Sequence, residues 1–523
     1  MRSFFKALVG LSAVGGSFAS QWSGWGGNIF NNRVASPDVE VSSKSLSSLS
    51  QHCKIDHPVG VSATPVIEGT IAYYPTWGGL FLAVNYQTCQ VVWQVNVTKI
   101  ITDFGPIVGT EIITKPISRT SPAIDVNGGV LYFATQTHAL LVALDVNSGK
   151  MLGLQQVSSH PQAIITQSPT FFDNQIFVGV SSQEESAAVS IPNYKCCSFI
   201  GSMTSWTFNR LGRTFRHVWS HDMLPYNTEW SGVAVWGSQP AIDPGRRQVF
   251  IGTGNTYTTP TQFEKCVNET AATCLPQDVL QESVIAFDID TGRMNWINRV
   301  GALDAWTVAC IKPGEPQNCP EFPGPDSDFG MAPSFVPSPN GDSRQDLLVV
   351  GQKNGILHQF NAATGEMVWA TQVAPGGVGG GLSWGVAADS SRAYFTAINS
   401  ANVSWNLMPS GQAIHNSGYG AADIKTGKIL WETQTPVNNA AYGPPSVVND
   451  IIIVTRSGEN TPTGNTTMGG MVVLNKATGA ILGDIEVAAI ARGGVAAFGR
   501  YLLFGTGYNG FTGTGSLYVY RAN

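Results

Sequence analysis

Apolar and polar residues alternate over short runs along most of this chain, and turn residues separate the runs. Val284 to Phe287 is one such run; the acidic turn Asp288 to Gly292 follows it, and a second run ends at Trp296. A period of two predicts β-strands, and Thr-Gly after an acidic loop supplies the positive-φ residue that a tight hairpin needs. This stretch is therefore expected to form two antiparallel strands joined by a short turn.

The same hairpin phrase recurs along the chain. Seven copies are recognisable, and the other six are Val84–Trp93, Leu144–Lys150, Phe208–Arg213, Phe360–Trp369, Asp423–Trp431 and Leu474–Ala480. The copies at 84–93 and 208–213 depart furthest from the common phrase. Repetition at this spacing indicates a repeat architecture rather than several unrelated domains.

Each unit also has a first and a second strand ahead of the hairpin. Proline leads into the first strand at Pro122, Pro169, Pro240, Pro333 and Pro445, and second strands are expected at 131–133, 248–251, 347–350, 393–395 and 451–454. A unit thus holds four strands in roughly fifty to eighty residues. The extra length lies at 258–280 and 303–331, in loops that are expected to cover one mouth of a central channel.

The two ends of the chain complement each other. Residues from Gly494 to Tyr520 hold three strand-like runs without a fourth, and residues 37–60 hold no complete repeat. We expect the N-terminal segment to supply the missing strand, which removes the exposed edges of an open array. The prediction is an all-β fold, an eight-bladed β-propeller closed by its N-terminal segment, with residues 21–523 as one domain.

Composition and charge narrow the classes of partner. Charged residues make up 12% of the 523 residues, glycines number 58, and the net charge is −6. Such a composition is typical of tightly turned β-structure. No basic run is present, so nucleic acid and anionic membranes are poor partners. We separately expect a small-molecule substrate and a monomeric protein.

Residues 1–20 have the features of a secretory signal. Arg2 and Lys6 precede an apolar centre, and Phe18-Ala-Ser20 provides small residues before Gln21. The apolar part is too short to span a bilayer, and no later segment qualifies as a span. Sequons at Asn96, Asn268, Asn402 and Asn465 agree with secretion and N-glycosylation.

The eight cysteines form an even set, as an oxidising compartment favours. Their spacing predicts two local staples, Cys266 with Cys274 and Cys310 with Cys319. Cys53 and Cys89 are placed to join neighbouring blades. Cys196 and Cys197 are adjacent; they either close an eight-membered ring, a strained feature often found at functional sites, or pair elsewhere.

The repeated Leu-Asp-x-x-Thr-Gly-x-x-x-Trp phrase resembles the repeat of the quinoprotein alcohol dehydrogenase propellers, whose redox cofactor is pyrroloquinoline quinone (PQQ). The polyvinyl-alcohol-dehydrogenase-like branch is the most similar, and the resemblance covers essentially the whole mature chain. The segments that carry it beyond the repeats include Trp22–Gly27, Cys196–Gly201, Val235–Asp243, Gly252–Asn255, Asp304–Cys310, Pro325–Gly330 and Gly380–Gly385.

The resemblance implies roles for several residues. Asp328 would take the proton of an alcohol while hydride passes to the quinone, and Lys353 would contact the quinone oxygen. Glu184 and Asn255 would bind calcium through oxygen atoms, with Glu185 as the competing choice for the first. Asp326 is the weaker candidate beside Asp328. Each of these residues is also explicable as an ordinary polar loop or turn residue.

Aromatic and sulfur groups complete the implied cofactor site. Trp236 would be the floor under a planar ring, and the Cys196–Cys197 ring would stack on the cofactor. Trp384 is either a cofactor contact or a packing residue. Most other tryptophans, Trp296 and Trp369 among them, are expected to pack between blades.

Three functions follow from these observations. The first is a secreted PQQ- and calcium-dependent dehydrogenase that oxidises an alcohol or sugar; without a Cys-x-x-Cys-His motif it would carry no haem c. The second uses the same pocket without any cofactor, as a non-redox cyclase of a fungal polyketide or terpenoid pathway, for example a hetero-Diels–Alderase that traps its reactants in one geometry. The third is a non-catalytic scaffold built on the same repeat.

Overall fold

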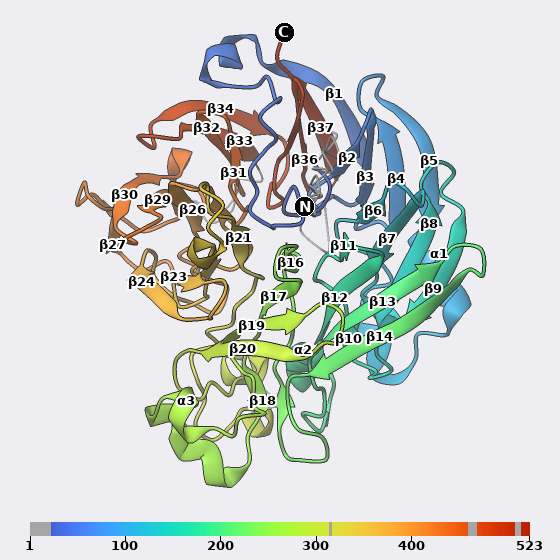
Figure 1. Ribbon diagram of the computed structural model, residues 1–523, viewed down its shortest axis with the longest axis vertical. Helices are drawn as coiled ribbons and strands as arrows, with labels where there is room; N and C mark the ends of the chain where they lie inside the picture. Colours follow the sequence, from blue (N-terminus) through green and yellow to red (C-terminus); the bar gives the residue numbers. More distant parts are fainter. Residues whose placement is uncertain (1–21, 313–315, 459–467, 508–513) are drawn as a thin grey trace, which may run out of the picture.

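The computed structural model describes residues 22–312, 316–458, 468–507 and 514–523. In Figure 1 the chain forms a ring of radially arranged sheets around a central axis, with colours that follow the sequence around the ring. Residues 1–20, where the signal is predicted, and the sequon at Asn465 lie outside the described residues.

Eight four-stranded antiparallel units form the ring, as the repeat predicts. Blade 1 is β2–β5 (Val66–Glu68, Ile71–Pro75, Leu80–Asn85, Gln90–Asn96), and blade 2 is β6–β9 (Ala123–Asp125, Val130–Ala134, Leu140–Asp145, Met151–Gln156). Blade 3 is β11–β14 (Thr170–Phe172, Gln175–Ser182, Ser202–Asn209, Thr214–Asp222), and the short strand β10 (Ala163–Ile164) also pairs with β12. Blade 4 is β16, β17, β19 and β20 (Ala241–Asp243, Gln248–Gly252, Ser283–Asp288, Met294–Arg299). Blade 5 is β21–β24 (Ser334–Val336, Leu347–Gly351, Ile356–Asn361, Met367–Gln372), and blade 6 is β25, β26, β29 and β30 (Ala387–Ala388, Arg392–Ala397, Gly418–Asp423, Ile429–Gln434). Blade 7 is β31–β34 (Ser446–Val448, Ile451–Arg456, Gly469–Asn475, Ile481–Val487). Blade 8 is β35–β37 with β1 (Ala496–Phe498, Tyr501–Gly505, Gly515–Arg521, Ser50–His57).

Short elements decorate the ring. Two small two-stranded sheets are β15 (Ser231–Gly232) with β18 (Thr256–Thr258) and β27 (Trp405–Asn406) with β28 (Ala413–Ile414). The helices are α1 (Val97–Phe104), α2 (Glu184–Ser190) and α3 (Ala271–Cys274), and the 3₁₀ turns are η1 (Ser43–Ser48), η2 (Gly109–Ile113), η3 (Thr137–Ala139), η4 (Thr261–Asn268), η5 (Val308–Cys310), η6 (Pro316–Asn318), η7 (Ser343–Gln345) and η8 (Pro436–Asn438). Within the part of the chain that the structure describes, every helix is too short or too polar to serve as a membrane span.

The hairpin phrase has a packing reason that links each blade to the next. The indole N–H of Trp296 in blade 4 donates to the carbonyl of Ala362 in the hairpin of blade 5 at 3.2 Å. A Cβ on Gly365 of that hairpin would come within 2.3 Å of the Trp296 ring, and the φ of Gly365 is 73°. Glycine is therefore required twice over, for its backbone conformation and for the ring that covers it.

The same pairing explains the weak copy in blade 3. Blade 2 has no tryptophan on its outer strand, and its Gly153 instead lies against the backbone of Arg213 and the ring of Phe208. The hairpin of blade 3 meets no indole there, so a non-glycine residue, Arg213, takes the positive φ of 56°. The departure of this copy is thus a consequence of packing between blades 2 and 3.

The ring closes as the sequence predicts. Strand β1 pairs antiparallel with β37, from Ser50 opposite Arg521 to His57 opposite Gly515. The Cys53–Cys89 disulfide then joins β1 to the hairpin of blade 1. The predicted pairs Cys266–Cys274 and Cys310–Cys319 are also formed. Of the two alternatives for Cys196 and Cys197, the structure has the disulfide between the adjacent residues.

Residues 22–35 form a further closure, which we call the inner belt. Its carbonyls accept hydrogen bonds from the innermost strands of five blades, through Ile67, Ile242, Phe335, Ala388 and Val447. Arg33 in the belt is fully buried, and its guanidinium donates to the carbonyls of Trp25, Pro445 and Val495. The belt therefore ties opposite sides of the ring together at one level of the channel.

Candidate functional site

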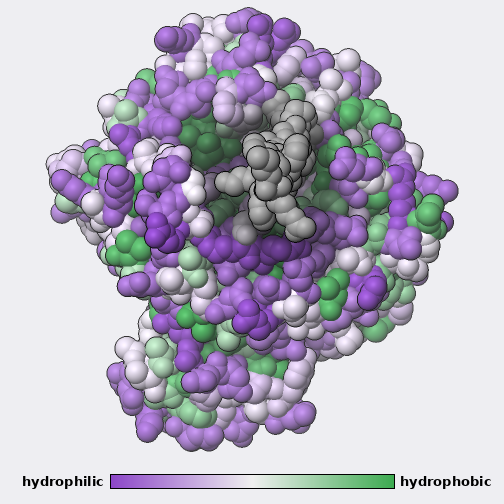
Figure 2. All heavy atoms as spheres, viewed as in Figure 1, coloured by the Kyte–Doolittle hydropathy of each residue, from purple (hydrophilic) through white to green (hydrophobic). Residues whose placement is uncertain are grey.

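A pocket lies on the axis of the ring, beside the inner belt. It encloses about 580 Å³, part of which is open to solvent, and Figure 2 shows this face of the molecule hollowed near its centre. Its walls come from the segments that lead into the innermost strands, and they include Ser62, Arg119, Ser168, Ser238, Trp384, Pro444 and Gly494. One turn from each of seven blades thus supplies the lining, as the radial fold dictates.

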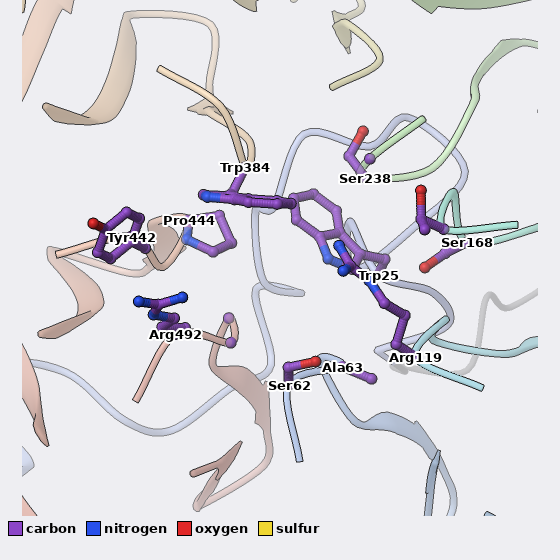
Figure 3. A pocket seen from close by; sticks show the side chains of 14 residues that line it. Trp25, Ser62, Ala63, Arg119, Ser168, Ser238, Trp384, Tyr442, Pro444 and Arg492 are labelled. Carbon is purple, nitrogen blue, oxygen red and sulfur yellow. The ribbon is translucent and has the colours of Figure 1, made fainter. Parts of the chain in front are cut away.

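Two indole rings and two guanidinium groups dominate this axial pocket. Figure 3 shows Trp25 of the inner belt beside Trp384, with Arg119 and Arg492 approaching from different sides. The guanidinium of Arg119 lies 5.6 Å from the centre of the Trp384 ring, and that of Arg492 lies 4.4 Å from the Tyr442 ring. Trp384 in turn meets Trp236 edge to face at 5.6 Å, so Trp384 lines the pocket and adjoins the predicted floor residue.

Beyond Trp236 lies a buried cluster of one lysine and two aspartates. The ammonium group of Lys353 is 2.7 Å from Oδ1 of Asp326 and 3.1 Å from Oδ2 of Asp328. It also lies 5.3 Å from the centre of the Trp236 ring. The structure therefore brings together Trp236, Asp328 and Lys353, three of the residues that the resemblance singled out.

The two aspartates are held differently. Asp328 accepts the backbone N–H of Asn255 at 2.6 Å on Oδ1 and the indole N–H of Trp236 at 3.1 Å on Oδ2, in addition to Lys353. Oδ2 of Asp326 has no hydrogen-bond partner among the described residues. Asp326, the weaker candidate in the sequence, is thus the one with an uncommitted carboxylate oxygen.

A third acid fixes the loop that carries these aspartates. The carboxylate of Asp304 accepts the backbone N–H groups of Asp326 and Ser327, at 3.2 and 2.7 Å. Asp326 has a φ of 61°, a conformation that non-glycine residues rarely adopt. The two hydrogen bonds to Asp304 hold the loop in that conformation.

Burial and mutual repulsion shift the pKa values of these groups. Burial raises the pKa of Asp326 well above its usual range, against the lowering effect of Lys353. Burial also raises the pKa of Glu185 well above its usual range, and the charges of Asp326 and Asp328 add to that rise. For Lys353 burial acts downward, but the charges of Asp328, Asp326 and Glu185 prevail and raise its pKa.

A further buried acid, Glu282, adjoins the cluster. Burial raises the pKa of Glu282 well above its usual range, and its neighbour Asp304 adds to the effect. One oxygen of Glu282 accepts from the amide of Gln352 at 3.0 Å, and the other has no partner among the described residues. The cluster is thus rich in carboxyl groups relative to its single lysine.

Glu185, rather than Glu184, faces the cluster. The carboxylate of Glu184 accepts the backbone N–H groups of Ser198 and Phe199 at 2.9 and 2.8 Å and the hydroxyl of Tyr194 at 2.9 Å. These bonds occupy the carboxylate of Glu184, the residue predicted to bind calcium. Helix α2 begins at Glu184, and adjacent residues of a helix point in different directions, so Glu185 points elsewhere. The carboxylate of Glu184 is thus engaged in hydrogen bonds, while Glu185, the alternative that the sequence left open, is the acid that interacts electrostatically with the cluster. Calcium binding by either residue stays a prediction.

Asn255 lies beside the cluster, and its backbone N–H donates to Asp328. Its amide nitrogen donates to the carbonyls of Thr256 and Trp306 at 2.8 and 2.9 Å. With the nitrogen used in this way, the amide oxygen is the atom that remains to accept or to bind a cation. Among the described residues no three His, Cys, Asp or Glu side chains converge to hold a metal by themselves.

The Cys196–Cys197 disulfide lies at the edge of this region. Cys197 packs in the same apolar cluster as Phe199, Tyr257 and Trp236. Glu184 anchors the two residues that follow the disulfide, through their backbone N–H groups. A stacking contact with a cofactor remains a prediction for this pair.

Several residues of the site were missed by sequence reasoning. Asp304 stands in a segment recognised as family-specific, but nothing in the sequence indicates that it caps the 326–327 amides. Arg119 and Arg492 gave no signal, because isolated arginines before glycine- or proline-rich turns are common on any surface. Glu282 gave none, because its burial is decided by how blades 4 and 5 pack.

The sequence is similar to one family model and to two characterised proteins. A family model described as the outer membrane protein assembly factor BamB matches residues 280–500. The chain is 28% identical over 425 residues to a polyvinylalcohol dehydrogenase of Sphingopyxis sp. (strain 113P3), covering 79% of this chain and 59% of the relative. It is 27% identical over 389 residues to one of Pseudomonas sp., covering 72% of this chain and 55% of the relative. The chain thus spans less than two thirds of the length of the curated relatives it matches.

Solved structures share the fold. A europium-containing methanol dehydrogenase superposes with a TM-score of 0.67 at 15% identity, covering 96% of this chain and 98% of the other. The quinohemoprotein alcohol dehydrogenase ADHIIG of Pseudomonas putida HK5 superposes with a TM-score of 0.69 at 14% identity, covering 96% and 80%. At these identities the likeness concerns the fold alone.

Proposed function

We propose that this chain, a PQQ-type quinoprotein propeller of the polyvinyl-alcohol-dehydrogenase-like branch, oxidises the hydroxyl group of a small-molecule alcohol or sugar at the Asp326–Asp328–Lys353 cluster. The proposal rests on one observation. The ammonium group of Lys353 contacts two buried carboxyl groups, those of Asp326 and Asp328, next to the Trp236 ring and the axial pocket. In the reaction the substrate would lose a hydride from carbon and a proton from oxygen, and become an aldehyde or ketone.

The residues present fit a flat, anionic quinone and a hard cation. Trp236 and Trp384 offer aromatic faces and edges, and Arg119 and Arg492 offer charges suited to carboxylates. Glu185, Asp328 and the amide oxygen of Asn255 are the oxygen donors that calcium prefers, and further ligands would have to come from the cofactor. When bound, PQQ supplies the acceptor for the hydride.

The residues of the chain would divide the remaining work. Asp326 carries the oxygen without a partner and a raised pKa, so we assign proton removal from the alcohol to Asp326 rather than to Asp328. Asp328 would hold Trp236 and Asn255 in place through its two oxygens. Lys353 would stabilise negative charge that develops nearby, because its ammonium group donates to both aspartates.

Reconstitution tests the proposal. Purified protein is mixed with PQQ and calcium, quinone absorbance is followed, and turnover of alcohols and of poly(vinyl alcohol) is assayed with an artificial electron acceptor. Asp326→Asn should lower kcat about 100-fold to 10,000-fold, and Asp328→Asn should weaken cofactor binding as well. Asp278→Asn, at an exposed aspartate, is the control. Absence of any quinone complex would end the dehydrogenase proposal.

A cofactor-independent cyclase is the second candidate, and the lining of the axial pocket favours it. Indole rings with two guanidinium groups can hold an apolar reactant and polarise its carbonyl without a redox group. A neighbouring polyketide or terpenoid gene cluster, together with no quinone binding, would support this function over the first.

We also propose that the protein is secreted and N-glycosylated. Four disulfides fit an oxidising compartment, and Asn96, Asn268 and Asn402 are exposed in the structure. Cleavage before Gln21 is expected, and N-terminal sequencing of the secreted protein together with a mass shift on deglycosylation tests both points. Material that retains residues 1–20 and carries no glycan would contradict the proposal.

A further inference from the structure

A groove lies at the outer edge of the ring, between blades 5 and 6, and we call it the rim groove. It encloses about 660 Å³, part of which is open to solvent. Its walls are residues 372–375 at the end of β24, Trp405, Asn406 and Met408, and Ile429 and Glu432 of β30. None of these residues lines the axial pocket or belongs to the cluster around Lys353. The rim groove is therefore a space separate from the candidate active site.

One wall of the rim groove is an insertion in blade 6. The β27–β28 hairpin stands between the second strand of the blade, β26, and the third, β29, whereas residues 352–355 are enough to connect the corresponding strands of blade 5. The hairpin forms a sheet of its own beside the four strands of blade 6. Figure 1 shows β27 at the outer edge of the ring, near β24 and β30. The insertion thus adds no strand to the blade, and it supplies the outer wall of the groove.

Glu432 is the titratable residue among those that line the rim groove, and it is 8% exposed. Its Oε2 accepts the backbone N–H of Met408 at 2.6 Å, while Oε1 is buried and has no hydrogen-bond partner among the described residues. Burial raises the pKa of Glu432 to about 7, and the N–H of Met408 acts in the opposite direction. A buried acid that lacks a partner lowers stability, and such an acid in a cleft is typical of a binding or catalytic site.

The other polar groups of the lining favour a ligand that donates hydrogen bonds and carries a positive charge. Gln372 uses its amide nitrogen for the carbonyls of Asn354 and Ala374, which leaves its amide oxygen as an acceptor. No lysine, arginine or histidine is among the lining residues. The indole N–H of Trp405 donates to the carbonyl of Asn416 at 3.2 Å, so Trp405 offers its aromatic ring, which attracts cations.

The rest of the lining is apolar and suits a hydrocarbon body. Val373, Pro375 and Ile429 contribute aliphatic surface beside the Trp405 ring. Met408 is 49% exposed, and its unbranched side chain is the part of the lining that can move to admit a ligand to Oε1 of the acid. The groove thus combines an apolar wall with a single acid at its base.

We propose that the rim groove binds an apolar primary amine, with its ammonium group paired to Oε1 of Glu432 and its hydrocarbon part on Trp405 and Ile429. This site goes beyond the proposed function and does not depend on it. No covalent bond forms or breaks on binding. Because an ammonium group pairs with the ionised carboxylate, binding below the folded pKa of Glu432 displaces the proton of Glu432 into solvent.

Three probes of similar size test the proposal: 2-phenylethylamine, 2-phenylacetamide and 3-phenylpropanoate. Calorimetry on the purified full chain should show that the amine binds tightest and the anion weakest. At pH 6, titrations in two buffers that differ in ionisation enthalpy should reveal release of about one proton for each amine bound. The affinity for the amine should fall about 10-fold to 100-fold from pH 8 to pH 5, as Glu432 takes up its proton while the ammonium group stays charged.

Glu432→Gln removes the acid while it keeps the size of the side chain. The affinity for the amine relative to the amide at pH 8 should fall about ten-fold or more, and proton release should vanish. Glu366→Gln, at an exposed glutamate of blade 5, should change neither. Met408→Trp fills the groove and should weaken the amine and the amide together, while its melting temperature shows that the protein is folded.

Three results would overturn the inference. They are equal binding of the three probes, a preference for the amine that survives Glu432→Gln, and tightest binding of the amide with an affinity that falls as pH rises. The last result would mean that Glu432 acts as a neutral hydrogen-bond donor. Binding of the amine should be the same with and without PQQ and calcium, so loss of the dehydrogenase function leaves this site in place, and loss of this site leaves quinone binding and turnover unchanged.

Discussion

The ammonium group of Lys353 lies between two buried carboxylates, and this arrangement has a cost as well as a use. Asp326 and Asp328 share this one cation in a site that water barely reaches. A single cation compensates both. Breaking a buried ion pair of this kind is strongly destabilising, because the remaining charge is neither paired nor hydrated.

Lys353→Met should therefore lower the free energy of unfolding by about 3–5 kcal/mol. Adding Asp326→Asn to the variant should recover part of that loss, since only one carboxylate then remains without its partner. Denaturant unfolding followed by tryptophan fluorescence measures both. Lys476→Met, which breaks a more exposed pair with Asp389, should cost under about 1 kcal/mol. A loss of that smaller size for Lys353→Met would mean that the aspartates are hydrated.

Glu432 offers a pH-dependent test at the same scale, far from the cluster. One oxygen accepts the backbone N–H of Met408 at 2.6 Å, the other has no partner among the described residues, and burial raises the pKa to about 7. The folded state thus holds this proton more tightly than the unfolded chain does. Its contribution to stability is fully present below the unfolded pKa of about 4.3 and is lost as pH rises through the folded pKa.

Glu432→Gln should accordingly stabilise the protein above neutral pH, by about 2–3 kcal/mol at pH 8, and should make little difference near pH 4. Melting temperatures of the native protein and the variant across this pH range check the sign. The exposed substitution Glu366→Gln should produce no such pH-dependent difference. Parallel curves for native and Glu432→Gln proteins would show that Glu432 ionises with an ordinary pKa.

At the scale of elements, the inner belt explains how eight similar blades are held in one arrangement. The belt contributes backbone acceptors to five innermost strands, whereas hairpins and tryptophans connect only neighbouring blades. Arg33 is its central residue: the guanidinium is buried against Trp25 and Trp22, and burial lowers its pKa to about 9. The guanidinium donates hydrogen bonds to carbonyls of the belt and of the segments that lead into blades 7 and 8.

Arg33→Leu should destabilise the protein by about 3 kcal/mol or more, since several buried carbonyls lose their donor together. The melting temperature should fall, and the fluorescence of Trp25 and Trp22 should change in the folded state. Arg500→Leu removes an exposed pair with Glu40 and should cost under about 1 kcal/mol. Equal effects of the two substitutions would mean that the belt contributes little to the ring.

At the scale of the whole molecule, closure of the ring depends on strand β1 and on one disulfide. Cys53–Cys89 connects residues 36 apart in sequence and joins the last blade to the first, whereas Cys266–Cys274 closes a separation of 8 within one loop. A longer closed loop restricts the unfolded chain more. The first bridge also acts where the ring would open.

Cys53→Ser with Cys89→Ser should therefore cost about 4 kcal/mol, against about 2.5 kcal/mol for Cys266→Ser with Cys274→Ser, on loop-closure entropy alone. Denaturant unfolding of both double variants under non-reducing conditions gives the comparison. A smaller cost at the ring closure than in the local loop would show that β1 holds the ring without the bridge.

The local pattern of the sequence determined the blades, the hairpins, the closing strand and three of the four disulfides, and it left the pairing of Cys196 and Cys197 open. Strand alternation, Thr-Gly turns and cysteine spacing are local properties, and a repeat multiplies each weak signal. The sequence also pointed to Asp328, Lys353, Trp236 and Asn255, because these stand in short segments with a recognisable resemblance.

Tertiary structure alone decided how the two acids of each closely spaced pair are placed. Glu185 rather than Glu184 faces the cluster, and Asp326 rather than Asp328 keeps an oxygen without a partner. Neighbouring side chains differ by a rotation about the backbone, and that rotation is set by distant groups, the 198–199 amides in one case and Asp304 in the other. Such contacts between blades leave no trace in the spacing of residues along the chain.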